Sequence, residues 1–280
     1  MWDASKGYEW GLDASDAAPA ALAPDLKQVV HEAFEPLAHA VFHNVPAYLY
    51  GPAGSGKNVL VEQVCLALSL PFHFMGCVTD EYKLAGFVDA RGAYHETEFR
   101  RAFEGGGVFF LDEFDASDPA VAVALNGAIA NGYFAFPDKA VRAHPDFRVI
   151  AAGNTLGTGR DAVYTGRMQL DAASLNRFAT IPVGYDPAID FVCADGDKDL
   201  VAFIGAYREA CAARGVPSVA SYRNIKMIRV YAPVMAPEQV LVLALTKDLG
   251  ADDVTALLGT GVFSEANPWT AALRRVPGLL

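Results

Sequence analysis

Short apolar runs recur along the first two thirds of the chain, separated by segments with a helical or a turn pattern. Each run is too short for an amphipathic helix and is bounded by Gly, Pro or polar residues, which is typical of buried β-strands. The run at 108–111 is apolar throughout, which indicates a strand covered on both faces. The predicted strands are 47–50, 72–75, 108–111, 147–152 and 179–183.

Helical periodicity appears between these runs. The segment after residue 57 places Leu60 and Val64 on one line and ends before Pro71, because a residue that precedes proline disfavours the helical conformation. A second helix is predicted to begin at Asp118, which can cap it and is followed by proline, and to end at Gly132. The other elements predicted here are a helix at 25–40 that contains Pro36, a hairpin at 84–94, a helix at 96–103 and a hairpin at 133–142.

The two ends of the chain differ from this alternating region. The first two dozen residues are rich in Ala, Asp and Pro, so they predict an extended arm with Tyr8 and Trp10 as its anchors. After Pro187 the pattern is helical only, and the last residues carry no recognisable motif. The helices predicted there are 200–213, 222–231, 237–247 and 252–258.

Composition restricts the class of protein. The 280 residues are 52% hydrophobic and 20% charged, which is typical of a well-packed folded protein with one large or two modest domains. A net charge of −11 argues against a broadly basic face for nucleic acid. No apolar run approaches the roughly 20 residues that cross a bilayer, and no signal peptide is apparent, so we expect a soluble cytoplasmic protein. The four cysteines lack metal-site spacing and are interpreted as reduced, mostly buried thiols: Cys65, Cys77, Cys193 and Cys211.

Residues 51–57 read Gly-Pro-Ala-Gly-Ser-Gly-Lys and lie between a predicted strand and a predicted helix. A glycine-rich turn at this place directs backbone N–H groups into one hollow at the positive end of the helix dipole, where phosphate oxygens bind. Gly54 and Gly56 permit the tight backbone, and Lys57 can reach the terminal phosphates. The pattern predicts a nucleoside-triphosphate site. The residues expected to contact ATP are Pro52, Ala53, Gly54, Ser55, Gly56, Lys57, Asn58 and Val59.

Two carboxylates follow the apolar run at 108–111. Ligands bind at the carboxyl ends of strands in open α/β sheets, and Asp112 and Glu113 emerge at such an end. We expect Asp112 to hold hydrated Mg²⁺ and Glu113 to orient and deprotonate the attacking water. Asp115 and Asp118 are interpreted as structural, the second as a helix cap.

Two further polar residues beside strands are weaker candidates. Asn154 follows the run at 147–152 and can hold a water beside the γ-phosphate without adding charge, although asparagine is also common in Gly-Asn turns. His73 lies within an apolar run and is interpreted as structural, because a single histidine there is more often part of the core than of a site.

The predicted hairpin at 84–94 has two interpretations. It is either a plain surface hairpin or a loop that projects into a central pore, where Lys83, Phe87 and Tyr94 would touch a substrate. The residues themselves favour neither interpretation.

The order of these motifs resembles that of AAA+ ATPases. More narrowly, the chain resembles the branch with a helix-2 insertion, which contains the MoxR-type proteins and the cobaltochelatase ATPase subunit, and it is similar to AAA+ proteins of phages and prophages. The likeness covers residues 41–235. The segments that carry it are 51–57, 110–113, 153–155, 175–178 (Leu-Asn-Arg-Phe) and 221–223 (Ser-Tyr-Arg).

This resemblance implies an α/β fold. Residues 41–185 would form an AAA+ αβα sandwich with a five-stranded parallel sheet, residues 186–280 a small helical lid and tail, and residues 1–40 an arm and a helix. The hairpin at 84–94 would be the helix-2 insert.

The resemblance also implies roles for single residues. Asn154 matches the sensor asparagine, Arg177 the arginine that reaches into the neighbouring subunit's site, and Arg223 the lid arginine that closes over the γ-phosphate. A permanently charged, forked donor suits such roles because it stabilises charge spread over the phosphoryl oxygens. Arg160 and Arg167 are second candidates for the role in the neighbour's site.

The favoured function is an ATP-hydrolysing ring, a homo-hexamer, that remodels a protein partner. One alternative is a nucleic-acid motor or a restriction-type component, and another is a nucleotide-gated assembly switch with little turnover. The chain has 22 Lys and Arg against 33 Asp and Glu, which favours a protein partner because phosphate contacts require clustered cations.

Asn58 stands where the phosphate loop usually carries Ser or Thr, whose hydroxyl ligates Mg²⁺. An amide oxygen is also a neutral, hard ligand, but asparagine is longer by one atom and Mg²⁺ tolerates little departure from octahedral geometry. We therefore predict an active but slow ATPase with a raised Mg²⁺ requirement. A site that binds nucleotide without turning it over is the alternative.

Overall fold

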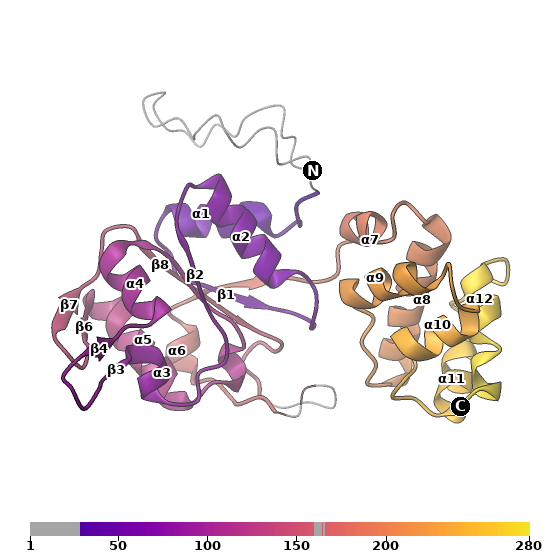
Figure 1. Ribbon diagram of the computed structural model, residues 1–280. Coiled ribbons are helices and arrows are strands. Elements are labelled where there is room, and N and C mark those ends of the chain that lie inside the picture. The colour runs from indigo at the N-terminus through magenta and orange to yellow at the C-terminus, as the bar shows by residue number, and fades with distance from the viewer. Residues whose placement is uncertain (1–28, 160–163, 165) are drawn as a thin grey trace, which may run out of the picture. The chain divides into compact units, whose positions relative to one another are not determined.

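The computed structural model describes residues 29–159, 164 and 166–280. The predicted arm with Tyr8 and Trp10 lies outside the described residues, as does Arg160. The chain forms two compact units (Figure 1): Gly56–Val183 with the residues up to Gly51, and Gly184–Leu280 with Pro52–Ser55. The predicted boundaries at residues 40 and 185 stay predictions.

A five-stranded sheet forms the centre of the first unit. Its strands are β1 (Ala47–Tyr50), β2 (Phe72–Met75), β5 (Gly107–Leu111), β8 (Phe147–Gly153) and β9 (Ala179–Pro182). They lie in the order β2-β5-β8-β1-β9, and every neighbouring pair is parallel. The predicted α/β fold with a five-stranded parallel sheet is confirmed.

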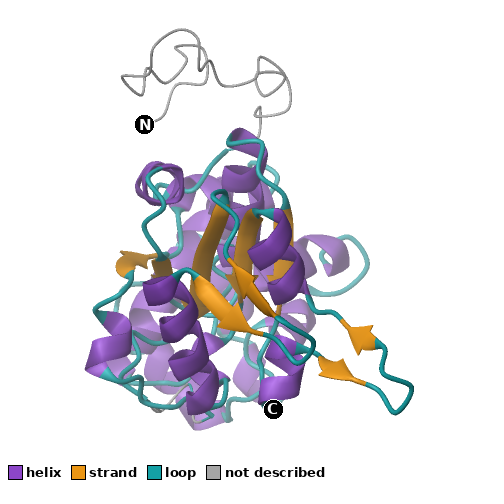
Figure 2. Cartoon of the chain, turned by 90° about the vertical axis from the view of Figure 1, so that its left-hand side faces the viewer, coloured by secondary structure: helices purple, strands orange, loops and turns teal. Residues whose placement is uncertain are grey.

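Helices cover both faces of this sheet (Figures 1 and 2), as the apolar run at 108–111 predicted. Side chains of a strand alternate between the two faces. Phe109 and Leu111 therefore pack in one core, and Val108 and Phe110 pack in the other. The first core contains α4 (Glu98–Gly105) and α5 (Pro119–Asn131), and the second contains α1 (Phe34–Phe42) and α2 (Lys57–Ala67).

The helix predicted at 25–40 is shorter at its start than the periodicity indicates. Residues 29–33 are not helical, and α1 begins at Phe34. Pro36 therefore lies in the first turn, where a missing backbone N–H costs no helical hydrogen bond. In contrast, α5 has its predicted ends: Asp118 accepts a hydrogen bond from the Ala120 amide, and Gly132 caps the helix in the left-handed conformation.

The hairpin predicted at 84–94 is narrower than expected. Leu84 belongs to α3 (Glu81–Ala85), a short helix that Asp80 caps by accepting from the Lys83 amide. The hairpin consists only of β3 (Phe87–Val88) and β4 (Tyr94–His95). The second predicted hairpin is present as β6 (Tyr133–Ala135) and β7 (Ala140–Arg142).

The second unit is helical around its own apolar core. Two of its helices were not predicted, although each begins with a capping residue followed by proline, at Asp186-Pro187 and Asn267-Pro268. Its helices are α7 (Pro187–Cys193), α8 (Lys198–Arg214), α9 (Tyr222–Tyr231), α10 (Pro237–Ala244), α11 (Ala251–Leu258) and α12 (Pro268–Leu273). Throughout the part of the chain that the structure describes, the helices are too short or too polar to cross a membrane.

Candidate nucleotide-binding site

The sheet order brings three predicted site segments to one edge. Strand β8 lies between β5 and β1, and all three run in the same direction. The phosphate loop follows β1, Asp112 follows β5 and Asn154 follows β8, so all three lie at the carboxyl edge where α/β sheets bind ligands. Residues about 100 positions apart in sequence thus become neighbours because of the crossover connections.

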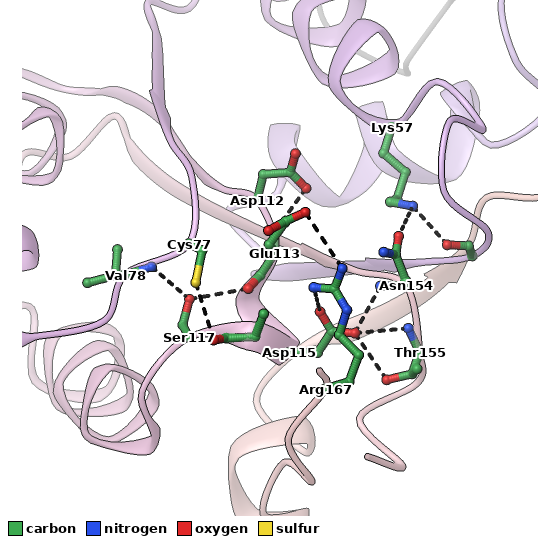
Figure 3. A network of polar contacts seen from close by, with 12 residues as sticks. Lys57, Cys77, Val78, Asp112, Glu113, Asp115, Ser117, Asn154, Thr155 and Arg167 are labelled. Carbon is green, nitrogen blue, oxygen red and sulfur yellow. Dashed lines mark hydrogen bonds and ion pairs between the residues drawn. The ribbon is translucent and has the colours of Figure 1, made fainter. Parts of the chain in front are cut away.

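The phosphate loop has the backbone that its glycines predict. Gly56 adopts φ 87° and forms the N-cap of α2, and Lys57 is the first helical residue. The Lys57 side chain is turned into the site, and the residue is only 7% exposed. Its ammonium donates to the Gly51 carbonyl (2.8 Å) and to Asn154 Oδ1 (3.2 Å), as Figure 3 shows. The lysine and the predicted sensor asparagine therefore meet in one site.

The residues present fit a bound triphosphate. Ser55 lies in the loop, fully buried, and among the described residues its hydroxyl has no hydrogen-bond partner. A buried polar group without a partner is uncommon in native proteins, and a bound group supplies one. Together with the N-terminus of α2 and the Lys57 ammonium, this hydroxyl makes the loop suited to an anion that carries several oxygens.

The two acidic residues lie on a sharply turned backbone. Glu113 adopts φ 54° and ψ 38°, which is uncommon for a residue other than glycine. Asp112 Oδ1 accepts a hydrogen bond from the Glu113 amide (2.9 Å), which stabilises this conformation. The Glu113 side chain is 51% exposed, whereas Asp112 is half-buried. Asp112, and Asn58 in the first turn of α2, are the residues that would hold Mg²⁺.

The structure assigns Asp115 a larger part than the predicted structural role. Its carboxylate is fully buried directly beside the site. Oδ2 accepts from the amides of Asn154 (2.9 Å) and Thr155 (3.0 Å) and from the Thr155 hydroxyl (3.1 Å). Asp115 thus fixes the backbone that carries Asn154. In the sequence, the position of Asp115 two residues after Glu113 is the local signal that could have indicated its contact with the backbone of Asn154.

The predicted arginines lie in different environments. Arg167 donates to Asp115 Oδ1 (2.9 Å), so it is engaged within its own subunit. Arg177 follows α6 (Ala172–Leu175) and is exposed, with one hydrogen bond to the Ala173 carbonyl (2.7 Å). Arg223 is exposed on the first turn of α9 in the second unit. The roles of Arg177 and Arg223 stay predictions.

The hairpin residues proposed as substrate contacts divide into two kinds. Lys83 and Phe87 are exposed, and the Phe87 ring stacks on His95 with 4.8 Å between centroids. Tyr94 is not presented in this way, because its hydroxyl donates to the Ala85 carbonyl (2.7 Å) at the base of the hairpin. His73 pairs with Glu98 on α4 at 3.0 Å, which agrees with its structural interpretation.

Comparison with known proteins agrees with this geometry. Residues 46–178 match the family of AAA domains of the dynein-related subfamily. This stretch begins just before β1 and ends just before β9, so it contains the phosphate loop, both acidic residues and Asn154. Residues 46–178 therefore match an AAA domain, which confirms the resemblance to AAA+ ATPases that the motif order predicted.

The chain is also similar to individual known proteins over part of its length. It is 30% identical over 180 residues to an uncharacterized protein of Staphylococcus haemolyticus, and the aligned region covers 59% of this chain and 63% of that protein. It is 26% identical over 174 residues to the aerobic cobaltochelatase subunit CobS of a Sinorhizobium species, and the aligned region covers 54% of this chain and 51% of that subunit. The chain thus spans less than two thirds of the length of these relatives. The fold is similar to that of NtrX from Brucella abortus, with a TM-score of 0.50 at 15% identity over 75% of this chain and 52% of that one.

Proposed function

We propose that this protein is a Mg²⁺-dependent ATPase that assembles into a homo-hexameric ring and remodels a protein partner. The observation that carries this proposal is the contact between Lys57 Nζ and Asn154 Oδ1 (3.2 Å), with Asp112 and Glu113 directly after β5, the strand that pairs with β8. A phosphate-binding cation, a neutral water-holding amide and a carboxylate base at one sheet edge are the groups that phosphoryl transfer to water requires.

Each group has a distinct task in this proposal. Lys57 and the N–H groups of the loop bind the phosphates, and Glu113 accepts a proton from the attacking water as its oxygen bonds to the γ-phosphorus. Asn154 orients that water. When bound, Mg²⁺ neutralises charge on the β- and γ-phosphates and would be held by Asp112 and Asn58.

Arginines would complete the site. A guanidinium beside the γ-phosphate stabilises the charge that spreads over the phosphoryl oxygens as the bond to the leaving group breaks. We assign this task to Arg223 within the subunit and to Arg177 from the neighbouring subunit. The exposure of Arg177 supports the second assignment, since a residue that acts across a subunit boundary must be accessible on its own subunit. Supplying one arginine from a neighbour makes hydrolysis depend on assembly.

The proposed partner is a protein, not a nucleic acid. The relative CobS is by its name a subunit of a cobaltochelatase, so at least one similar AAA domain belongs to a larger protein assembly. The net charge of −11 supports the same choice, because binding to a phosphate backbone gains most of its affinity from clustered cations. Tight, salt-sensitive binding to DNA would overturn it.

The direct test of this function compares two variants with the natural protein. Glu113→Gln should bind ATP with unchanged affinity and lose at least about 100-fold in hydrolysis, because the amide keeps the shape but cannot accept the proton. Lys57→Ala should weaken ATP binding itself, because a charged phosphate contact disappears. Binding is measured with a fluorescent ATP analogue, and hydrolysis by phosphate release. Hydrolysis by Glu113→Gln at the natural rate would show that the base is assigned to the wrong residue.

A second candidate function rests on Asn58. An amide at this position does not reproduce the short hydroxyl ligand, and this favours a nucleotide-gated assembly switch if the longer side chain misplaces the metal. The switch and the motor share nucleotide binding and differ in turnover. The variant Asn58→Thr distinguishes them.

A further inference from the structure

Arg167 connects Asp115 to the proposed base. Its Nη1 donates to Asp115 Oδ1 (2.9 Å), and its Nη2 lies 3.6 Å from Glu113 Oε1. The second distance is too long for a hydrogen bond but short enough for an ion pair. The Arg167 side chain is 12% exposed and that of Glu113 is 51% exposed, so solvent screens this charge interaction from one side only. Figure 3 shows the guanidinium between the two carboxylates.

The second carboxylate oxygen of Asp115 is also fixed by hydrogen bonds. The Asn154 amide and both donor groups of Thr155 occupy Oδ2. The Thr155 carbonyl in turn accepts from the Tyr48 hydroxyl (2.7 Å) on strand β1. Burial and the nearby Asp115 charge raise the pKa of this hydroxyl, so it remains a donor at neutral pH. A guanidinium bound to such an anchored carboxylate has little freedom to move.

The backbone of the base is also held in place. The left-handed conformation of Glu113 is stabilised by the Asp112 carboxylate at its amide (2.9 Å) and by the Ala116 amide at its carbonyl (2.9 Å). The backbone of Glu113 is thus fixed, and its side chain can still rotate. The Arg167 guanidinium lies beside the Glu113 carboxylate.

We propose that Asp115 and Arg167 form a positioning pair for hydrolysis. The Asp115 carboxylate holds the backbone of Asn154 on one side and the Arg167 guanidinium on the other, and the guanidinium sets where the Glu113 carboxylate lies relative to Asn154. This inference rests on the proposed ATPase function. It also assigns Arg167 to the site of its own subunit. The sequence had made Arg167 a second candidate for a role in the neighbouring subunit's site.

The kinetic test uses Arg167→Met, Asp115→Asn and the double variant. Methionine keeps the apolar part of the arginine side chain and removes the guanidinium group. Asparagine removes the negative charge of Asp115 that binds this guanidinium. Each single variant should lose about 100-fold in kcat, the cost of misplacing a reacting group by about 1 Å, with KM for ATP changed less than about threefold. Because the two residues act as one unit, the double variant should be no slower than the slower single variant.

A matched control separates positioning from plain stability. Arg100 on α4 is also buried in an ion pair, with 4% exposure and 2.9 Å to Asp138, and it lies in the same unit away from the site. Arg100→Met should lower the melting temperature and leave kcat within about twofold of the natural value. If Arg167→Met lowers the melting temperature in the same way and leaves kcat unchanged, the pair is structural only and the proposal fails.

Subunit mixing tests the assignment to one subunit. Arg177→Ala and Glu113→Gln subunits, when mixed, should recover turnover if Arg177 acts in the neighbour's site, because some sites then contain every group. Arg167→Met mixed with Glu113→Gln should recover none, because each subunit damages its own site. Recovery in the second mixture would show that Arg167 acts across the boundary and would overturn the proposal.

A measurement without nucleotide distinguishes failure of the pair from failure of the ATPase function. The Asn154 and Thr155 amides donate to Asp115, so their hydrogen exchange in the nucleotide-free protein should be about tenfold faster in Asp115→Asn and also faster in Arg167→Met. Arg100→Met should leave both amides unchanged. If the natural protein hydrolyses no ATP, the ATPase function fails and these amides still test the pair. Unchanged exchange in both site variants would refute the pair even in an active ATPase.

Discussion

Gly153 is the residue at which a single methyl group should disturb both the core and the site. It is the last residue of β8, where Tyr48 and Asp115 pack against its Cα. A Cβ built there lies 2.1 Å from the Tyr48 hydroxyl oxygen and 2.8 Å from Asp115 Cγ. Carbon atoms in contact prefer about 3.5–4.0 Å, so neighbours would have to move by roughly 1 Å. Neither neighbour is a flexible surface group, since both are fully buried.

The expected cost of Gly153→Ala follows from this packing. Overfilling a packed core costs about 1–3 kcal/mol, and the closeness of both contacts favours the upper part of that range. Alanine also restricts the unfolded chain, which returns about 0.5 kcal/mol. The net loss in the free energy of unfolding should be about 2 kcal/mol. A urea titration that is monitored by far-ultraviolet circular dichroism measures this free energy of unfolding.

Two further variants make this reasoning refutable. Tyr48→Phe removes the nearest atom, so Gly153→Ala should cost at least about 1 kcal/mol less in that background. Gly127 provides the control, because it lies within α5 and, apart from its chain neighbours and the nearby helix backbone, no atom of the described residues lies within 4 Å of a Cβ built on it. Gly127→Ala should stabilise the protein by about 0.5–1 kcal/mol. If Gly153→Ala costs the same with and without the Tyr48 hydroxyl, the close contact is not the cause of the loss.

Two other predictions concern the metal and the cysteines. Asn58→Thr should lower the Mg²⁺ concentration needed for half-maximal ATP hydrolysis, because the shorter hydroxyl side chain would restore the ligand that this position of the loop usually supplies. In a magnesium titration of the assembled protein, turnover only in Asn58→Thr would replace the motor with the switch. Burial raises the pKa of the Cys65 thiol to about 12 and that of Cys211 to about 11, so little reactive thiolate exists at pH 8. Iodoacetamide should therefore alkylate half-buried Cys77 before either of them, which mass spectrometry of the folded protein measures, and faster labelling of Cys65 would contradict its burial.

Sequence reasoning succeeded where the deciding interactions are local. The run at 108–111 is apolar because both faces of β5 are covered, and a continuous apolar pattern expresses this directly. The ends of α5 were predicted for the same reason, since Asp118 and Gly132 act on residues within one helical turn. The phosphate loop is likewise a local backbone motif, with the left-handed Gly56 just before Lys57.

It was less successful where distant contacts decide. Leu84 was assigned to a hairpin, although it belongs to α3 and is buried in a core with Phe99 and Phe103 of α4. The segment that contains Arg167 has no periodicity, and its partner Asp115 lies 52 residues earlier. No local pattern encodes such a pair, so the sequence did not indicate the contact between Arg167 and Asp115.

The three acidic residues after β5 show how the backbone separates groups that the sequence places together. Asp112, Glu113 and Asp115 lie within four positions, yet one is half-buried, one exposed and one fully buried. The left-handed turn at Glu113 is followed by a 3₁₀ turn at Phe114–Ala116, and this backbone places the third carboxylate in the core while the first two stay accessible. Only the third accepts from three donors of Asn154 and Thr155 and from an arginine, so it can hold other residues in place but cannot reach a substrate. All three residues carry a carboxylate, and their different burial suits them to different tasks.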